Sequence, residues 1–310
     1  METKERPVSK FTSRLSYTFG AFGKDVFYAA LSSYLIMFIT SHLFNTGDKA
    51  TNNRLISYVT LIIMILRIVE LLIDPFIGNA IDRTKTRWGH FRPWVVVGGT
   101  ISSVALLILF TNMGGLNKSN PWLYLFIFAV LYITMDIFYS FKDIGFWSML
   151  PALSFDSRER EKIATLARIG STIGGSLVGV VVMPLVLFFS LQSNGGTGDD
   201  RGWFWFAFIV CATAFLSALA VGFGTREVEN DLRKNEEDTA GIGAVLKMLV
   251  KNDQLLWVAI AYLFYGIGVN LVNALELYYF TYIMGFSKGF SILSFINMSV
   301  GLFSVAFFPF

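Results

Sequence analysis

Apolar residues fall in long runs separated by short polar segments, and each run is long enough to cross a membrane. A helix of about 20 apolar residues spans the roughly 30 Å hydrocarbon core of a bilayer. Such runs occupy residues 15–40, 55–80, 94–112, 121–150, 163–190, 203–224 and 254–284, and an eighth begins near 290. Because the eighth run is still apolar at Phe310, we expect an all-α membrane protein that is a fragment with about seven and a half spans.

Composition supports a membrane protein and argues against several other classes. Of 310 residues, 54% are hydrophobic and 15% charged, a mixture that a soluble domain could not keep off its surface. The formal net charge of +3 is too small to indicate a nucleic acid partner. The single cysteine, Cys211, and the two histidines, His42 and His90, predict neither a disulfide framework nor a Cys/His metal site. We expect a lipid bilayer around the protein and no cofactor.

Lys and Arg residues are divided unevenly between the two sides of the predicted membrane. The N-terminal tail and the connections after even-numbered spans hold sixteen of them, and the opposite connections hold five. Since these residues concentrate on cytoplasmic loops, the N-terminus should be cytoplasmic. The longest polar segment follows six spans, which is typical of a linker between two halves. We place an N-terminal six-helix bundle at 1–224, a cytoplasmic linker at 225–253 and the start of a C-terminal bundle at 254–310.

Ten charged residues remain inside the predicted spans. A charge at a helix centre costs about 2.5–3.5 kcal/mol in a membrane, so these groups must pair with each other or face water. Six acids against four bases leave two negative charges uncompensated, and this deficit favours protonation of a carboxylate or binding of a cation such as Na⁺. The residues are Lys24, Arg67, Lys142, Arg168, Asp25, Glu70, Asp74, Asp136, Asp143 and Glu276.

Helical spacing places several of these residues on common faces. Arg67, Glu70 and Asp74 share one face of the second predicted helix, because residues three and four apart are neighbours on a helix. Asp136, Ser140 and Asp143 share a face of the fourth helix by the same rule. A purely architectural role in ion pairs is the alternative for Arg67 and Asp136, and it is equally open for Glu276, which lies alone near the outer end of its helix.

The first predicted helix carries Lys24 and Asp25 in mid-span, flanked by Gly20 and Gly23. Small residues in a membrane helix let another helix or a ligand come close to the backbone. The first, second and fourth helices are therefore expected to present polar stripes to a common interior.

Several motifs in chain order resemble the glycoside-pentoside-hexuronide cation symporters of the major facilitator superfamily. They are GAFGKD at 20–25, DP at 74–75, GNAIDRTKTRWGHFRPW at 78–94, KDIGFWSMLPAL at 142–153, DSRERE at 156–161 and KNDQ at 251–254. Within that family the chain is most similar to the lactose and galactoside permeases of Gram-positive bacteria, and more distantly to melibiose-type carriers. The resemblance implies the major facilitator fold, with twelve helices in the full protein.

The resemblance also implies a sugar site, whose residues here are Lys24, Asp25, Asp143, Trp147 and Arg168. Their chemistry suits a galactoside. Carboxylates accept hydrogen bonds from neighbouring hydroxyl groups, Lys and Arg donate them, and an indole ring packs on the C–H face of a sugar. Taken alone, without the resemblance, Trp147 would be interpreted as an interfacial anchor.

A cation site is implied at Glu70 and Asp74, with Ser140 as a hydroxyl ligand. Sodium-using members of the family tend to have aspartate at both acidic positions, whereas this chain has Glu70 at the first. Because a longer side chain alters a tight oxygen cage while a proton needs only one carboxylate, we favour H⁺ over Na⁺.

The loop after the second span resembles the general superfamily motif at Gly78, Asp82, Arg83 and Arg87. Asp82, Arg83 and Arg87 are therefore expected to form a cytoplasmic gate that alternates its ion pairs. The same basic residues would also serve simply as a positive-inside signal.

Together these features predict a symporter in a bacterial cell membrane that takes up a galactoside with a proton. The alternatives are a sugar uniporter or exchanger, a Na⁺-coupled carrier, a sugar sensor, and a membrane glycosidase with Glu70 and Asp74 as acid and base. The short loops argue against an enzyme. Some members of the family carry a phosphotransferase-type regulatory domain, so such a domain or partner protein is a further expectation.

Overall fold

The computed structural model describes residues 9–44, 49–192, 197–228, 251–284 and 287–307. The chain divides into two compact units, Met1–Val228 with Phe295–Phe310, and Glu229–Ser294. Among the described residues there is no β-strand, and Thr86 and Gly89 form an isolated bridge. The expected all-α class is therefore confirmed.

Six long helices lie in the Met1–Val228 part of the first unit: α1 (Lys10–Ala29), α3 (Lys49–Arg83), α4 (Arg92–Leu109), α6 (Pro121–Met149), α7 (Ser157–Phe189) and α8 (Asp200–Gly224). Shorter helical segments between them are η1 (Ala30–Tyr34), α2 (Leu35–Phe38), η2 (Ile39–Leu43), η3 (Met113–Gly115), α5 (Leu116–Ser119) and η4 (Leu150–Ala152). They are followed by α11 (Asp253–Tyr278), η6 (Tyr279–Ile283) and α12 (Ser287–Phe307).

Six helices in the described part of the chain are long and apolar enough to cross a membrane. They correspond to the second through seventh predicted spans. The first predicted span, 15–40, is also helical, but it is divided among α1, α2 and two π-helical segments. Its α1 part is more polar because it carries Lys24 and Asp25 in its second half.

Side chains that accept backbone hydrogen bonds mark where the long helices begin. Asp156, Asp199 and Asn120 precede α7, α8 and α6, and each accepts a hydrogen bond from a backbone N–H in the first helical turn. These N–H groups have no partner within the helix, so such caps stabilise the helix start. Pro121 occupies the first position of α6, where a missing N–H costs nothing.

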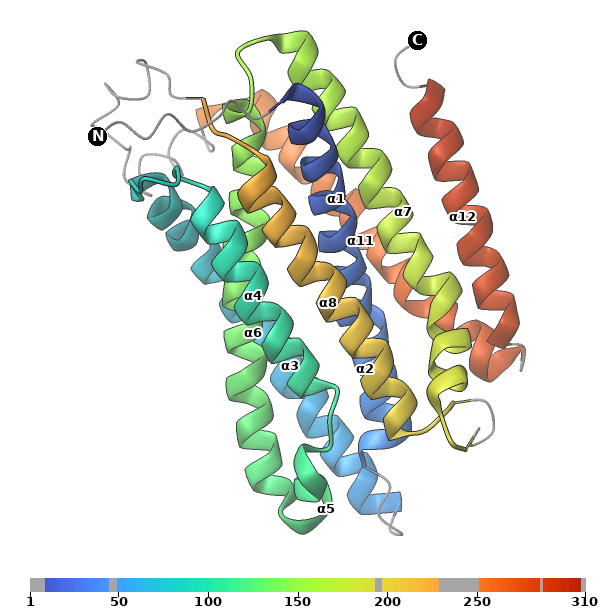
Figure 1. Ribbon diagram of the computed structural model, residues 1–310. Helices are drawn as coiled ribbons and strands as arrows, with labels where there is room; N and C mark the ends of the chain where they lie inside the picture. The colour runs from blue at the N-terminus through green and yellow to red at the C-terminus, as the bar shows by residue number, and fades with distance from the viewer. Residues whose placement is uncertain (1–8, 45–48, 193–196, 229–250, 285–286, 308–310) are drawn as a thin grey trace. The chain divides into compact units, whose positions relative to one another are not determined.

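The first unit is organised around α1, which packs against α7 and α8, while α4 packs against α6 and α8 (Figure 1). On α1, a Cβ atom at Gly23 would overlap Ser217 of α8, and one at Gly20 would overlap Val221. On α7, a Cβ atom at Gly170 would lie 2.5 Å from the carbonyl oxygen of Thr18. The glycines therefore allow close helix packing, as expected for Gly20 and Gly23.

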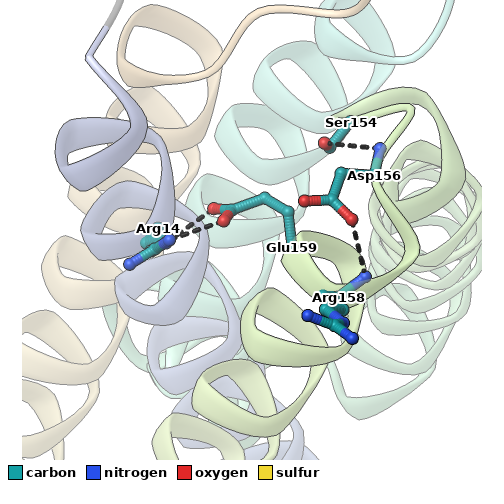
Figure 2. A network of polar contacts seen from close by, with 5 residues as sticks. All are labelled: Arg14, Ser154, Asp156, Arg158 and Glu159. Carbon is teal, nitrogen blue, oxygen red and sulfur yellow. Dashed lines mark hydrogen bonds and ion pairs between the residues drawn. The ribbon is translucent and has the colours of Figure 1, made fainter.

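At the predicted cytoplasmic end, an ion pair fastens the start of α1 to the start of α7 (Figure 2). Arg14 Nε donates to Glu159 Oε1 at 2.6 Å, and Arg14 Nη2 donates to Glu159 Oε2 at 2.5 Å. Figure 2 also shows Asp156 capping α7 and Ser154 accepting from the Asp156 backbone N–H at 3.2 Å. The acidic and basic residues of the DSRERE segment thus build a local hydrogen-bonded helix start.

The residues directly after α8 are tied to the same end of this unit. The carboxylate of Glu227 accepts hydrogen bonds from the backbone N–H groups of His90, Phe91 and Arg92, at 2.8, 2.9 and 3.0 Å. Val228 N donates to Ala152 O at 2.8 Å. The predicted linker, 225–253, therefore begins with residues that lie against the bundle, and its residues 229–250 are outside the described part of the chain.

Replacing Glu227 with Ala should lower the free energy of unfolding by about 1–3 kcal/mol, because three N–H groups at the start of α4 lose a charged acceptor. The thermal unfolding midpoint of the purified full-length protein in detergent measures this. Glu161→Ala is the matched control, since Glu161 is exposed on α7. Equal midpoints for the two variants would show that the Glu227 contacts contribute little.

Candidate functional site

Lys24 joins two carboxylates from different helices. Its Nζ lies 3.0 Å from Asp25 Oδ1 on α1 and 2.7 Å from Asp143 Oδ1 on α6. The side chain of Lys24 is 8% exposed, whereas that of Asp143 is 35% exposed. The buried ammonium group of Lys24 therefore joins the two carboxylates. The side chain of Asp143 is partly exposed, so a solute can reach it.

Trp147 lies one helical turn after Asp143 on α6, and its ring is contacted from a third helix, α7. Lys24 Nζ is 5.2 Å from the centre of the indole ring, and the Arg168 guanidinium of α7 is 5.0 Å from it. Both cations therefore lie at cation–π distance from one aromatic ring. The five residues predicted for the sugar, on α1, α6 and α7, are brought together in one cluster, which we call the tryptophan cluster.

The backbone beneath Trp147 is fixed by a buried aromatic contact. Tyr17 of α1 stacks on Phe146 with ring centres 4.2 Å apart, and its hydroxyl donates to the Phe146 carbonyl oxygen at 2.8 Å. Both residues are buried. This contact sets how α1 and α6 meet next to the tryptophan cluster.

Ser171 of α7 belongs to the tryptophan cluster, although it is not among the residues predicted from the sequence. Its hydroxyl donates a hydrogen bond to Asp25 Oδ2. Ser171 is three residues after Arg168, so both lie on one face of α7. The three-residue spacing from Arg168 could have pointed to Ser171. It could not show which helix packs against this face of α7.

A second cluster, which we call the carboxylate cluster, lies between α3 and α6. Arg67 Nη1 donates to Glu70 Oε2 at 2.8 Å and to Asp136 Oδ1 at 3.1 Å. Ser140 donates to Glu70 Oε1 at 3.3 Å. The architectural ion pairs considered for Arg67 and Asp136 are therefore present, and they include Glu70, a residue predicted for cation coupling.

Asp74 completes the carboxylate cluster and has an unfilled acceptor. Its Oδ1 is buried and has no hydrogen-bond partner among the described residues, and the hydroxyl of Ser140 lies beside its carboxylate. The three residues predicted for the cation, Glu70, Asp74 and Ser140, are thus brought together by α3 and α6. One guanidinium, that of Arg67, faces three carboxylates in this cluster, whereas charges in the tryptophan cluster are equal in number.

Lys142 is the fourth predicted intramembrane cation, and it joins neither cluster by an ion pair within the described residues. It is 1% exposed, and its Nζ has no hydrogen-bond partner in that part of the chain. The ammonium lies 5.6 Å from the centre of the Phe27 ring, and the side chain passes over Gly99 of α4. The remaining acid, Glu276, lies on α11.

The three residues predicted to gate the cytoplasmic side lie together at the end of α3 and in the loop after it. Asp82, Arg83 and Arg87 are exposed, and none of them forms an ion pair with another described residue. This loop is held instead by Glu227 and by Trp94 Nε1, which donates to Thr84 Oγ1 at 2.9 Å. The gating role of the three residues stays a prediction.

Comparison with known proteins shows which proteins the chain resembles. The chain is similar to the raffinose carrier protein of Pediococcus pentosaceus, with 67% identity over 296 residues, which are 96% of this chain and 46% of the relative. It is 58% identical over 300 residues to the lactose permease of Lactobacillus delbrueckii subsp. bulgaricus, which covers 97% of this chain and 47% of that protein. The isoprimeverose transporter of Lactiplantibacillus pentosus is 28% identical over 277 residues, with coverages of 88% and 53%.

The chain spans about half the length of these curated relatives. The relatives are named as carriers, permeases and transporters, which agrees with the expectation that the protein is not an enzyme. The family described as MFS/sugar transport protein matches residues 16–310. The resemblance to the sugar symporters of the major facilitator superfamily is thereby confirmed, and the chain belongs to the MFS/sugar transport protein family.

Proposed function

We propose that the full-length protein is a secondary active transporter that carries a galactoside into the cell together with a proton. The observation that carries the proposal is the pair of clusters on α6, one with balanced charges and one with an excess of carboxylates. A neutral sugar suits the balanced cluster, and a small cation suits the other. The protein is proposed to lie in a bacterial cell membrane with its N-terminus in the cytoplasm.

Several features support sugar binding at the tryptophan cluster. Asp143 and Asp25 are partly exposed and accept hydrogen bonds, while Arg168 donates them. Trp147 offers an aromatic face to the C–H surface of a pyranose ring. The names of the two relatives also support a galactoside as the substrate, because lactose and raffinose both contain a galactosyl unit.

Ion coupling is supported by the carboxylate cluster. Asp136 is 2% exposed and Glu70 is 18% exposed, so full ionisation there would leave negative charge in a medium of low polarity. Protonating Glu70 or Asp74 reduces this excess by one charge without rearranging the oxygen atoms. A Na⁺ ion at Glu70, Asp74 and Ser140 is the alternative, and the longer side chain of Glu70 favours the proton.

Alternating access then requires the cytoplasmic end to open and close. Asp82, Arg83 and Arg87 are exposed there and available to ion-pair partners outside the described residues. We assign them to a gate that forms when the cytoplasmic side is closed.

The proposal includes a regulatory phosphotransferase-type domain or protein as a partner of the full-length protein.

Transport assays on vesicles containing the full-length protein test the proposed function. Labelled lactose, melibiose and raffinose are offered with an imposed pH gradient, with a sodium gradient, or with neither. Accumulation against a concentration gradient should require the pH gradient. Accumulation driven by sodium alone would identify Na⁺ as the coupling ion, and equilibration without accumulation would indicate a uniporter.

Replacing Asp143 with Asn should weaken galactoside binding by about 10–100-fold, because Lys24 loses one partner and the sugar loses a charged acceptor. Equilibrium binding of a labelled galactoside to purified protein measures the change. Asp200→Asn, at the exposed start of α8, is the control and should bind normally. Wild-type affinity in the Asp143 variant would remove this residue from the sugar site.

Replacing Glu70 with Gln should abolish uphill accumulation and preserve sugar exchange. The amide keeps a hydrogen-bond acceptor for Ser140, but it cannot take up the coupling proton. Counterflow and gradient-driven uptake, measured on the same vesicles, separate the two activities. Undiminished accumulation would show that Glu70 is not needed for coupling.

A further inference from the structure

Arg67 is shared between two carboxylates through one nitrogen atom. Its Nη1 lies 2.8 Å from Glu70 Oε2 on its own helix and 3.1 Å from Asp136 Oδ1 on α6. The distances are similar, so neither carboxylate holds the guanidinium alone. Its Cζ atom lies 5.8 Å from the centre of the Tyr132 ring, which is within cation–π distance.

Asp136 depends on this contact more than Glu70 does. Its side chain is 2% exposed, and Arg67 is the one cation paired with it among the described residues. Glu70 is 18% exposed and also accepts a hydrogen bond from Ser140. The other charged groups near Asp136 are the carboxyl groups of Glu70 and Asp74, and the side chain of Glu70 also lies at hydrogen-bond distance from Asp136. A buried carboxylate deprived of its counter-ion is strongly destabilising, so Asp136 keeps a strong hold on the guanidinium.

This geometry bears on what happens when an ion reaches Glu70. A proton on Glu70 cancels its attraction for Arg67, and the guanidinium then needs another acceptor. Asp136 already lies at hydrogen-bond distance, so Arg67 can turn to it without leaving the interface between α3 and α6. Without Asp136, Arg67 would remain on Glu70 and compete with the incoming ion.

We infer that Asp136 is a positioning residue of the coupling site, which shares Arg67 with Glu70 in the ion-free state and takes over the guanidinium when the coupling ion binds. The inference rests on the proposed symport function. It assigns to Asp136 a part in ion binding that it performs through Arg67, without itself touching the sugar or the ion.

The test uses the full-length transporter in vesicles and measures how galactoside accumulation depends on pH. With Asp136→Asn, Arg67 pairs with Glu70 alone, so a higher proton concentration is needed to load the site. The midpoint of the pH profile should move to lower pH by about one unit, which is a tenfold change in proton concentration. Asp136→Glu, which keeps the carboxylate, should move it less, and sugar exchange should persist in both variants.

A double-mutant cycle separates this role from a general effect of the Asp136 charge. Arg67→Gln should by itself move the midpoint to higher pH, because Glu70 loses its competing cation. If Asp136 acts through Arg67, adding Asp136→Asn to that variant should cause no further acid shift. A full additional shift in the double variant would overturn the inference.

The outcomes also distinguish this inference from the proposed function. A wild-type protein whose accumulation ignores pH would overturn both. A pH-dependent wild type with an unchanged profile in Asp136→Asn would overturn the inference alone, as would equal loss of exchange and accumulation, which indicates a merely structural role. If Asp136→Asn does not reach the membrane, an unchanged profile in Arg67→Gln contradicts the inference from the other partner of the ion pair.

Discussion

The structure depends on one electrostatic constraint, which is that carboxylates buried among membrane helices must be compensated. Each uncompensated charge costs several kcal/mol, a large part of the net stability of a folded protein. The tryptophan cluster meets this constraint with Lys24 and Arg168. The carboxylate cluster meets it only in part, because among the described residues one cation, Arg67, faces Glu70, Asp74 and Asp136.

Helix α6 connects the two clusters. Asp136, Ser140, Asp143 and Trp147 follow one another at intervals of four, three and four residues, so they form one stripe along the helix. Ser140 contacts the carboxylate cluster, and Asp143 contacts Lys24. A change in charge at one cluster is therefore within a helical turn of the other. This proximity gives a physical basis for the proposed coupling of ion and sugar.

Much of this arrangement was predictable from the sequence, because membrane spans and helical faces follow from spacing alone. The resemblance to sugar symporters then selected the residues that the structure gathers around Trp147 and Glu70. What spacing could not provide was the identity of partners on other helices. The Arg67 bridge to Asp136, the hydroxyl of Ser171 on Asp25, and the Glu227 carboxylate at the start of α4 all join segments distant in sequence. Lys142 could be counted among the intramembrane charges, but its lack of an ion-pair partner among the described residues could not be known without the packing of α4 and α6.

The most direct test of the account is the internal pH of sealed vesicles that contain the full-length protein. A galactoside is added outside in the absence of any pH gradient, and a trapped pH indicator reports on the interior. If the buried carboxylates take up a proton with each sugar, the interior should become acidic as the sugar enters. Sugar entry with no change of internal pH, in a medium free of sodium, would contradict the account.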